Sequence, residues 1–345
     1  MRKALLAQVV EVGTDFSKRA RWCGSSRGLF DVSSWVRRLA YGYSYVRSAL
    51  SQEDRDTLDK WFLNGGNYFK DVLHETIARR FPKRLDDNYS TCASESFCPG
   101  KDRGLTHYGG YQTKNFQLAW NNQMAATAAC LGAIAVLLDN GTLKSHAKRF
   151  VKEWLKYGVF PGGQIFDQMR WNTGYTPEHG YVYPGTAIGS IISIVDHLAR
   201  AGDSELYEYS TSDGIYGTAG GSKSLLSVLR HFAGQTNGDV VEYASTGPAS
   251  DPNLIIDTGS TNFNMVTFVV LAPANIYYKD PELKRAYKTP IPSTYHTGGY
   301  DPLGGDWGSY PSIRFMFGER EQIAWPYASS LMSAPEHFRI VKGQS

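Results

Sequence analysis

The stretch NFQLAWNNQMAATAACLGAIAVLLD, residues 115–139, decides the fold expected for this chain. Its alanine-rich middle is apolar on almost every side, so a helix over Lys114–Asp139 would need other helices around it. The polar exception is the Trp-Asn-Asn-Gln run at 120–123. Consecutive buried amides need hydrogen-bond partners, which come either from neighbouring helices or from a ligand. The stretch therefore predicts an inner helix and marks a candidate binding site on it.

Helical patterns flank this stretch on both sides. From Asp31 onward, apolar residues recur at the i, i+3, i+4, i+7 spacing of a one-sided helix. Ser51, with Asp54 three positions later, is close to a capping box and predicts a helix that runs toward Pro82. Further helices are predicted over about Thr142–Tyr157, Pro184–Ala201 and Ser222–Phe232. In the second of these, Pro184 suits the first turn and Gly202 suits the stop.

Long helices joined by loops, without alternating strands, indicate helix-on-helix packing in a single domain that spans the chain. We therefore expect a mainly all-α protein, and successive helix pairs of about 40 residues suit an incomplete (α/α) toroid of helical hairpins. The final third differs in character. It is expected to hold short strand-like segments at Asp239–Tyr243 and Asn253–Asp257, and a long glycine- and tyrosine-rich binding loop at Ser293–Pro311.

Composition narrows the function. The chain has 345 residues and a formal net charge of +3, too small for the basic stripe of a typical nucleic-acid binder. No window approaches the roughly 18 consecutive apolar residues that a membrane helix needs. The 22 Tyr, 16 Phe and 8 Trp, with 35 Gly, suit a sugar-binding cleft, although most of these rings are expected in the core.

Cysteines and metal motifs add little. Cys92 and Cys98 either close a short disulfide loop or stay as free thiols, and Cys130 is expected to be buried and inert. We find no zinc or calcium ligand spacing, so no metal and no cofactor is expected.

A second cluster follows the break at Pro161–Gly163. Within 17 positions it collects ionisable and aromatic residues, which are Asp167, Arg170, Tyr175, Glu178, His179, Tyr181 and Tyr183. Structural roles are open for each: Arg170 could pair with Asp167 or Glu178, His179 could be a loop residue, and the tyrosines could pack. A cluster this dense nevertheless predicts a functional site.

These residues resemble the alginate-lyase-like polysaccharide lyases built on an (α/α) toroid, families 5 and 38, over roughly Leu29 to Gly214. Such lyases usually carry Asn-Asn-His on one helix and, about fifty residues later, an Arg followed by a Tyr. Here Asn121, Asn122 and Gln123 precede Arg170 by about that spacing. Gln123 stands where relatives often have His, and either Tyr175 or Tyr181 matches the family's tyrosine.

The resemblance implies cleavage of a uronic-acid polymer, of alginate or glucuronan type, by β-elimination. Asn122, helped by Gln123, would neutralise the carboxylate and stabilise the enolate-like intermediate. Arg170 would favour a tyrosine phenolate as base. Tyr175, Tyr181 or His179 would abstract the proton and protonate the leaving oxygen, and the choice among them stays open. Further contacts to substrate are expected from Trp120, Asn121, His107, Tyr108, His296, Trp307 and Arg314.

Two other classes remain. A glycoside hydrolase on a similar toroid would draw a carboxylate pair from Asp167, Glu178, Asp301 and Asp306. A non-catalytic glycan-binding protein would explain the aromatics and glycines.

The expected partner is an anionic polysaccharide, with no nucleic acid and no membrane, and the oligomeric state is open. The expected substrate lies outside cells, although no export signal is visible in the sequence. We therefore expect an extracellular or periplasmic enzyme if a leader was removed, or a virus-borne depolymerase.

Overall fold

The computed structural model describes residues 2–13, 15–16, 28–80, 119–165, 167, 179–213, 221–237 and 263–288. Most of these residues are helical, which confirms the mainly all-α prediction. The α-helices are α1 (Arg2–Val12), α3 (Gly28–Val46), α4 (Gln52–Arg80), α6 (Asn122–Leu137), α7 (Gly141–Glu153), α8 (His179–Arg200), α9 (Glu205–Glu208), α10 (Leu225–Asn237), α11 (Phe263–Tyr278) and α12 (Pro281–Lys288).

Short elements complete the described part of the chain. A 3₁₀ turn, η1 (Arg47–Ala49), follows α3, and a π-helical segment, η3 (Trp154–Gly158), continues α7. Strands β1 (Ser210–Thr211) and β2 (Lys223–Ser224) form one antiparallel pair.

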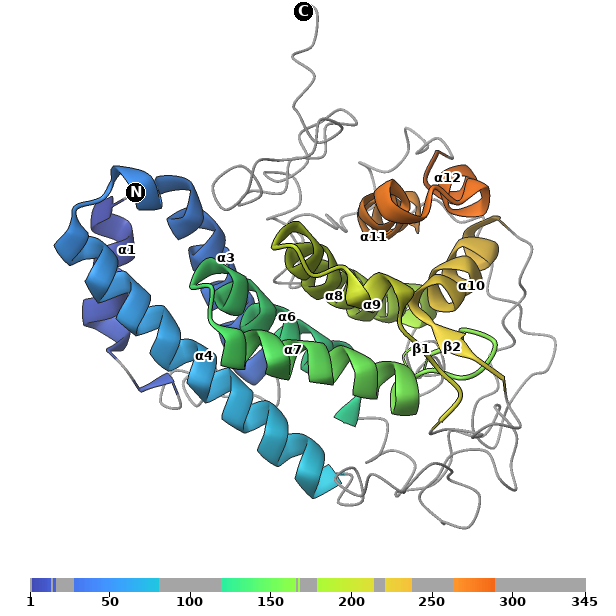
Figure 1. The fold of residues 1–345 in the computed structure, drawn as a ribbon, viewed down its shortest axis with the longest axis horizontal. Helices are drawn as coiled ribbons and strands as arrows, with labels where there is room; N and C mark the ends of the chain where they lie inside the picture. Colours follow the sequence, from blue (N-terminus) through green and yellow to red (C-terminus); the bar gives the residue numbers. More distant parts are fainter. Residues whose placement is uncertain are drawn as a thin grey trace, which may run out of the picture.

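Three helices, α3, α6 and α8, form the centre of the arrangement and run in the same direction, whereas α4 and α7 run back beside them (Figure 1). Thr127 Oγ1 on α6 lies 3.5 Å from Ser33 Oγ on α3. On the other side of α6, a Cβ built on Gly132 would lie 3.2 Å from Ile194 of α8, so glycine allows the two helices to pack closely. The amino-terminal ends of the three helices therefore share one end of the molecule.

Helix α6 is the inner helix that its sequence predicts, since every residue from Met124 to Leu137 is buried. Its start differs from the predicted Lys114. Asn121 has extended backbone, with φ −78° and ψ 176°, and its side chain accepts a hydrogen bond from the Met124 N–H at 3.1 Å. This is an N-cap, so the amide run lies at the beginning of α6 rather than inside a longer helix.

The connection from α6 to α7 is short. Asp139 adopts φ +50°, and the Asn140 N–H donates back to the Ala135 carbonyl at 2.9 Å, which closes the end of α6. The Asn140 side chain then accepts from the Leu143 N–H and caps α7. Helices α6 and α7 therefore form a helical hairpin with a tight turn. Together, α7 and η3 cover nearly the same residues as the predicted Thr142–Tyr157 helix.

Helix α8 begins at His179, earlier than predicted, and Pro184 lies inside it rather than in its first turn. A proline there removes one intrahelical hydrogen bond, and the burial of α8 among its neighbours outweighs that loss. The predicted stop is confirmed, because Gly202 adopts φ +91° directly after α8 and its N–H bonds the Ala199 carbonyl.

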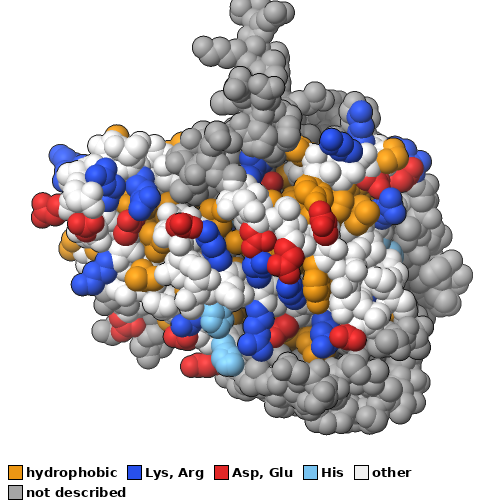
Figure 2. Space-filling model, in the orientation of Figure 1, with side chains coloured by type: hydrophobic (Ala, Val, Ile, Leu, Met, Phe, Trp, Pro, Cys, Tyr) orange, Lys and Arg blue, Asp and Glu red, His pale blue; other side chains and the backbone are white. Residues whose placement is uncertain are grey.

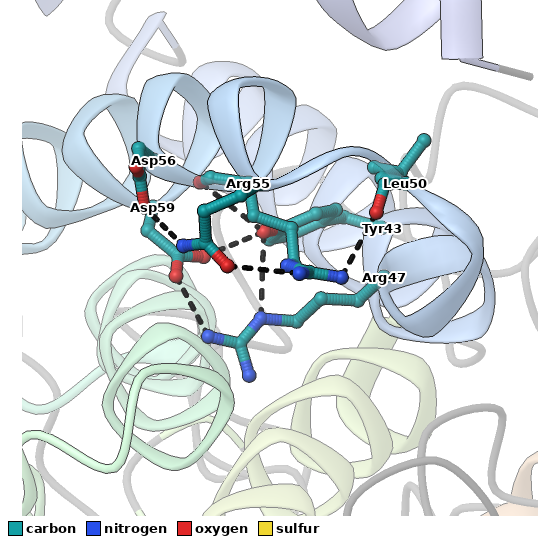
Figure 3. Close-up of polar contacts among 7 residues, drawn as sticks. Tyr43, Arg47, Leu50, Arg55, Asp56 and Asp59 are labelled. Atoms are coloured by element: carbon teal, nitrogen blue, oxygen red, sulfur yellow. Dashed lines mark hydrogen bonds and ion pairs between the residues drawn. The ribbon is translucent and has the colours of Figure 1, made fainter.

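The turn between α3 and α4 is held by polar side chains (Figure 3). The Tyr43 hydroxyl donates to Asp59 at 2.6 Å, and Arg47 donates to the other oxygen of the same carboxylate at 2.7 Å. Ser51 accepts from the Asp54 N–H, which confirms the predicted start of α4. The Asp54 carboxylate pairs with Arg2 of α1 instead of closing a capping box.

The final third contains α11 and α12, two helices that the sequence pattern does not predict. The predicted strands at Asp239–Tyr243 and Asn253–Asp257 and the loop at Ser293–Pro311 lie outside the described residues, as do Cys92 and Cys98. Cys130 is a buried free thiol whose pKa burial raises, in agreement with the prediction. Within the described ranges, no helix is both long enough and apolar enough to cross a membrane.

Candidate functional site

The candidate site lies at the beginning of α6. Asn122 is the first residue of the helix and only 3% of its surface is exposed. The first turn of a helix presents unpaired N–H groups and the positive end of the helix dipole, which favour an anion. The Asn121 side chain accepts a hydrogen bond from the Met124 N–H and serves as the N-cap. Of the three consecutive amides, Asn122 and Gln123 are therefore the two that do not cap the helix.

Trp120 lies in the core, with 1% of its surface exposed, rather than on an open cleft wall as expected. Its ring centroid is 5.9 Å from that of Phe150 and 5.8 Å from that of Tyr157. Its carbonyl accepts from the Trp154 indole at 3.2 Å. The Trp120 indole nitrogen is buried and has no hydrogen-bond partner in the described part of the chain. Trp120 therefore anchors the amide run, and its indole N–H is a donor that no described residue uses.

Gln123 connects the site to α3. Its side chain is partly exposed, in contrast to the rest of α6, and its carbonyl accepts from the Thr127 hydroxyl at 3.0 Å. Thr127 in turn contacts Ser33 of α3. A polar track therefore leads from the beginning of α6 into the interface with α3.

A small hairpin carries the chain from η3 toward the second predicted cluster. Val159 and Ile165 form an antiparallel bridge, and the Phe160 N–H donates to the Gln164 carbonyl at 2.9 Å. Gly163 adopts φ +90° at its tip and packs against Ser227 of α10. Asp167 follows and is 1% exposed, so a carboxylate of the predicted cluster is buried directly after the hairpin.

The remaining predicted residues are only partly located. His179 and Tyr181 lie at the beginning of α8, but the structure does not describe their side chains. Because α6 and α8 run in the same direction, this beginning shares an end of the molecule with Asn122 (Figure 1). Outside the described residues lie Arg170, Tyr175, His107, Tyr108, His296, Trp307 and Arg314.

Charges on the face drawn in Figure 2 are mixed, with Lys and Arg beside Asp and Glu. Lys148 of α7 bonds Asp203 at 2.7 Å and also pairs with Glu205, which Lys152 contacts as well. These two lysines lower the pKa of Glu205 to about 2. Positive charge on α7 is thus compensated locally.

A buried ionic group lies near the other end of α8. Arg200 donates to Asp196 at 2.6 Å, and burial raises the pKa of Asp196. Burial, with the nearby positive charges of Arg200 and Arg37, lowers the pKa of His197 well below its usual value, so this imidazole is neutral at pH 7. We regard the group as structural, since it lies in the helix interface away from the beginning of α6.

Three polar residues of α3 were not predicted from the sequence as site residues: Ser34, Arg37 and Arg38. Ser34 and Arg37 are buried, at 2% and 7% exposed, although their helix pattern reads as one-sided. The only feature of the sequence that pointed to these buried polar residues was a pair of adjacent arginines beside apolar positions. In the described ranges no group of three or more His, Cys, Asp or Glu side chains is placed to hold a metal ion.

No family model, curated protein or solved structure matches this chain.

Proposed function

We propose that this protein is a polysaccharide lyase that cleaves a uronic-acid polymer, of alginate or glucuronan type, by β-elimination on an incomplete (α/α) toroid. The observation that carries the proposal is Asn122, a buried amide in the first turn of α6. A carboxylate that approaches this end would meet the amide and the positive end of the helix dipole, toward which the N–H groups of the first turn point.

The reaction needs that environment. Removal of the proton at C5 of the uronate leaves two negative charges on the conjugated carboxylate, and the glycosidic oxygen at C4 then leaves with its electron pair and takes up a proton. Asn122 and Gln123 would stabilise the intermediate as the charge develops. Tyr175, Tyr181 or His179 would act as base and then as acid, with Arg170 favouring the phenolate form of the tyrosine.

The direction of the central helices supports this division of roles. The parallel course of α6 and α8 is compatible with a site to which Asn122 contributes from one helix and His179 or Tyr181 from the other (Figure 1). Parallel inner helices with returning outer helices are also what an (α/α) toroid requires. The substrate is an anionic polysaccharide outside cells, so we place the enzyme outside the cell, in the periplasm or on a virus particle.

The test is incubation with alginate, glucuronan and glycosaminoglycans. A lyase produces an unsaturated sugar that absorbs in the ultraviolet, without consumption of water. A hydrolase produces reducing ends without that absorbance, and a glycan-binding protein produces neither. Reducing ends that rise without new absorbance, or binding without turnover, would replace the proposal by one of these two classes.

Variants test the residues. Asn122→Ala should lower kcat by about 10²-fold or more, the usual loss when one donor to a developing oxyanion is removed. The matched control is Asn140→Ser, because Asn140 is also an asparagine at a helix start but caps α7 at the other end of α6.

Tyr175→Phe and Tyr181→Phe should differ sharply in activity. Near-normal rates for both would remove tyrosine from the mechanism.

A further inference from the structure

One face of α3 carries three polar side chains with buried atoms that form no hydrogen bond to any residue that the structure describes. Ser34, Arg37 and Arg38 are spaced i, i+3 and i+4, which places them together on the helix. The buried atoms without a hydrogen bond are Ser34 Oγ, Arg37 Nε, and Nε and Nη2 of Arg38. None of the described residues forms an ion pair with either arginine.

In this respect Arg37 and Arg38 differ from the other arginines that the structure describes. Every other arginine whose side chain the structure describes has a hydrogen-bond or ion-pair partner: Arg2, Arg47, Arg55, Arg149, Arg200, Arg230 and Arg285. Several of those are largely exposed, where an unpaired charge would cost little. Arg37 and Arg38, which have no such partner among the described residues, lie in contrast in the helix interface or are half-buried.

No carboxylate of the described residues forms an ion pair with these two arginines. Among the described residues, Arg37 shifts the pKa of Tyr41, Cys130, His197 and its neighbour Arg38, and none of these four groups carries a negative charge at pH 7. The carboxylate of Asp196 is engaged by Arg200. Burial and the charge of Arg37 together lower the pKa of Arg38. A buried positive pair of this kind is unfavourable unless an anion joins it.

We propose that Ser34, Arg37 and Arg38 form a binding site for an oxyanion, a carboxylate, phosphate or sulfate group. Guanidinium groups offer parallel N–H donors that match the two oxygens of such a group, and the serine hydroxyl adds another donor. The site adjoins the polar track from Gln123 through Thr127 to Ser33. It does not depend on the lyase proposal, since an oxyanion would compensate the charge whether or not a reaction follows.

The oxyanion has two possible sources, a uronate of a bound polymer or a free inorganic ion. The probes are oligoglucuronate, oligomannuronate, sodium phosphate and sodium sulfate, added to the full-length protein at constant ionic strength with sodium chloride. Binding is measured by calorimetry and by the shift of the thermal unfolding midpoint. Oligouronates that bind at least tenfold more tightly than phosphate and sulfate identify the polymer as the source, and equal or weaker binding identifies the inorganic ion.

Three variants decide whether α3 holds the ion. Arg37→Met and Arg38→Met should each weaken oxyanion binding about tenfold or more, while Arg149→Met, which removes an exposed arginine paired with Glu153, should leave it unchanged. Arg37→Met should also raise the unfolding midpoint in the absence of oxyanion, because it removes an uncompensated buried charge. If Arg37→Met fails to fold, Arg38→Met and Ser34→Ala measure the same loss. No saturable binding of any probe to the wild type, or equal binding by the wild type and these variants, would overturn the proposal.

Discussion

The pair Gly162 and Gly163 allows a sharp test of the hairpin that precedes Asp167. A Cβ on Gly163 would lie 2.3 Å from the Ser227 carbonyl oxygen and 2.7 Å from its carbon, and both atoms belong to the backbone of α10. The φ of +90° at Gly163 also disfavours any residue with a side chain. A Cβ on Gly162 would meet no atom within 4 Å, and its φ is not positive. The two alanine variants should therefore differ widely.

The expected magnitude follows from these two contributions. A left-handed conformation costs a non-glycine residue about 1–2 kcal/mol, and forcing an extra atom into a packed interface costs about 1–3 kcal/mol. Gly163→Ala should thus lower the free energy of unfolding by about 2–5 kcal/mol. Gly162→Ala should change it by less than about 1 kcal/mol, and in the stabilising direction, because alanine restricts the unfolded chain more than glycine does.

The assay is urea unfolding followed by far-ultraviolet circular dichroism, with both variants and the wild type analysed using a common slope. The hairpin contacts α10, so a lower midpoint for Gly163→Ala should accompany loss of the helical signal in a single transition. Free energies that agree within about 0.5 kcal/mol for the two variants would refute the reasoning. That result would mean that the hairpin does not pack against α10 in solution.

Two predictions concern pH. Burial lowers the pKa of Lys223 to about 7, although the Lys156 and Asp213 carbonyls accept its hydrogen bonds, so the unfolded chain binds an additional proton between pH 7 and about 10.5. The wild type should therefore gain stability relative to Lys223→Met as pH rises through this window, by at most about 5 kcal/mol, and parallel pH profiles from chemical denaturation would contradict the assignment. Glu205, with its pKa near 2, contributes stability that is present above about pH 4.5 and is lost as pH falls toward 2. Because Glu205 is about half exposed, Glu205→Gln should reduce stability at pH 7 by no more than about 1 kcal/mol and weaken the acid dependence, whereas an unchanged acid profile would show that its lysine contacts contribute nothing.

The central helix α6 could be predicted because its amino-acid composition alone indicates a buried helix. An alanine-rich run without a polar face has no stable place except among other helices, and α6 is buried accordingly. Its beginning could not be predicted in the same way. Asparagine suits an N-cap far better than a helix interior, but three consecutive amides at 121–123 give three possible starting points. Only the extended backbone at Asn121 identifies the cap.

Helix α11 shows the opposite case. Its residues include Val and Phe, which favour strands, and Pro273, which removes a hydrogen bond from a helix interior. Tertiary burial overrides these preferences, as Val270 packs against Gly189 of α8. Local propensity is a weak guide where an element is enclosed by others.

The candidate site likewise contains residues that the sequence predicts and residues that it does not. The amide run was identifiable because polar residues interrupt an apolar pattern, and Asn122 is indeed buried where a helix begins. The arginines of α3 were not identifiable, because Arg37 and Arg38 in a one-sided helix read as its solvated face. Their burial depends on which neighbours surround α3, and no local pattern contains that information.

The contact between Trp120 and the α7–η3 segment has a consequence for how the site forms. The Trp154 indole bonds the Trp120 carbonyl, and a Cβ on Gly158 would lie 2.9 Å from Trp120, so the peptide that enters α6 is clamped by residues 34 to 38 positions later. A separation of this length costs less loop-closure entropy than the contact between Thr127 and Ser33, which are 94 positions apart. The geometry around Asn122 therefore depends on this hairpin together with the packing of α6 against α3, and amide exchange at the beginning of α6 should be slow, because exposure of this turn requires these helices to separate.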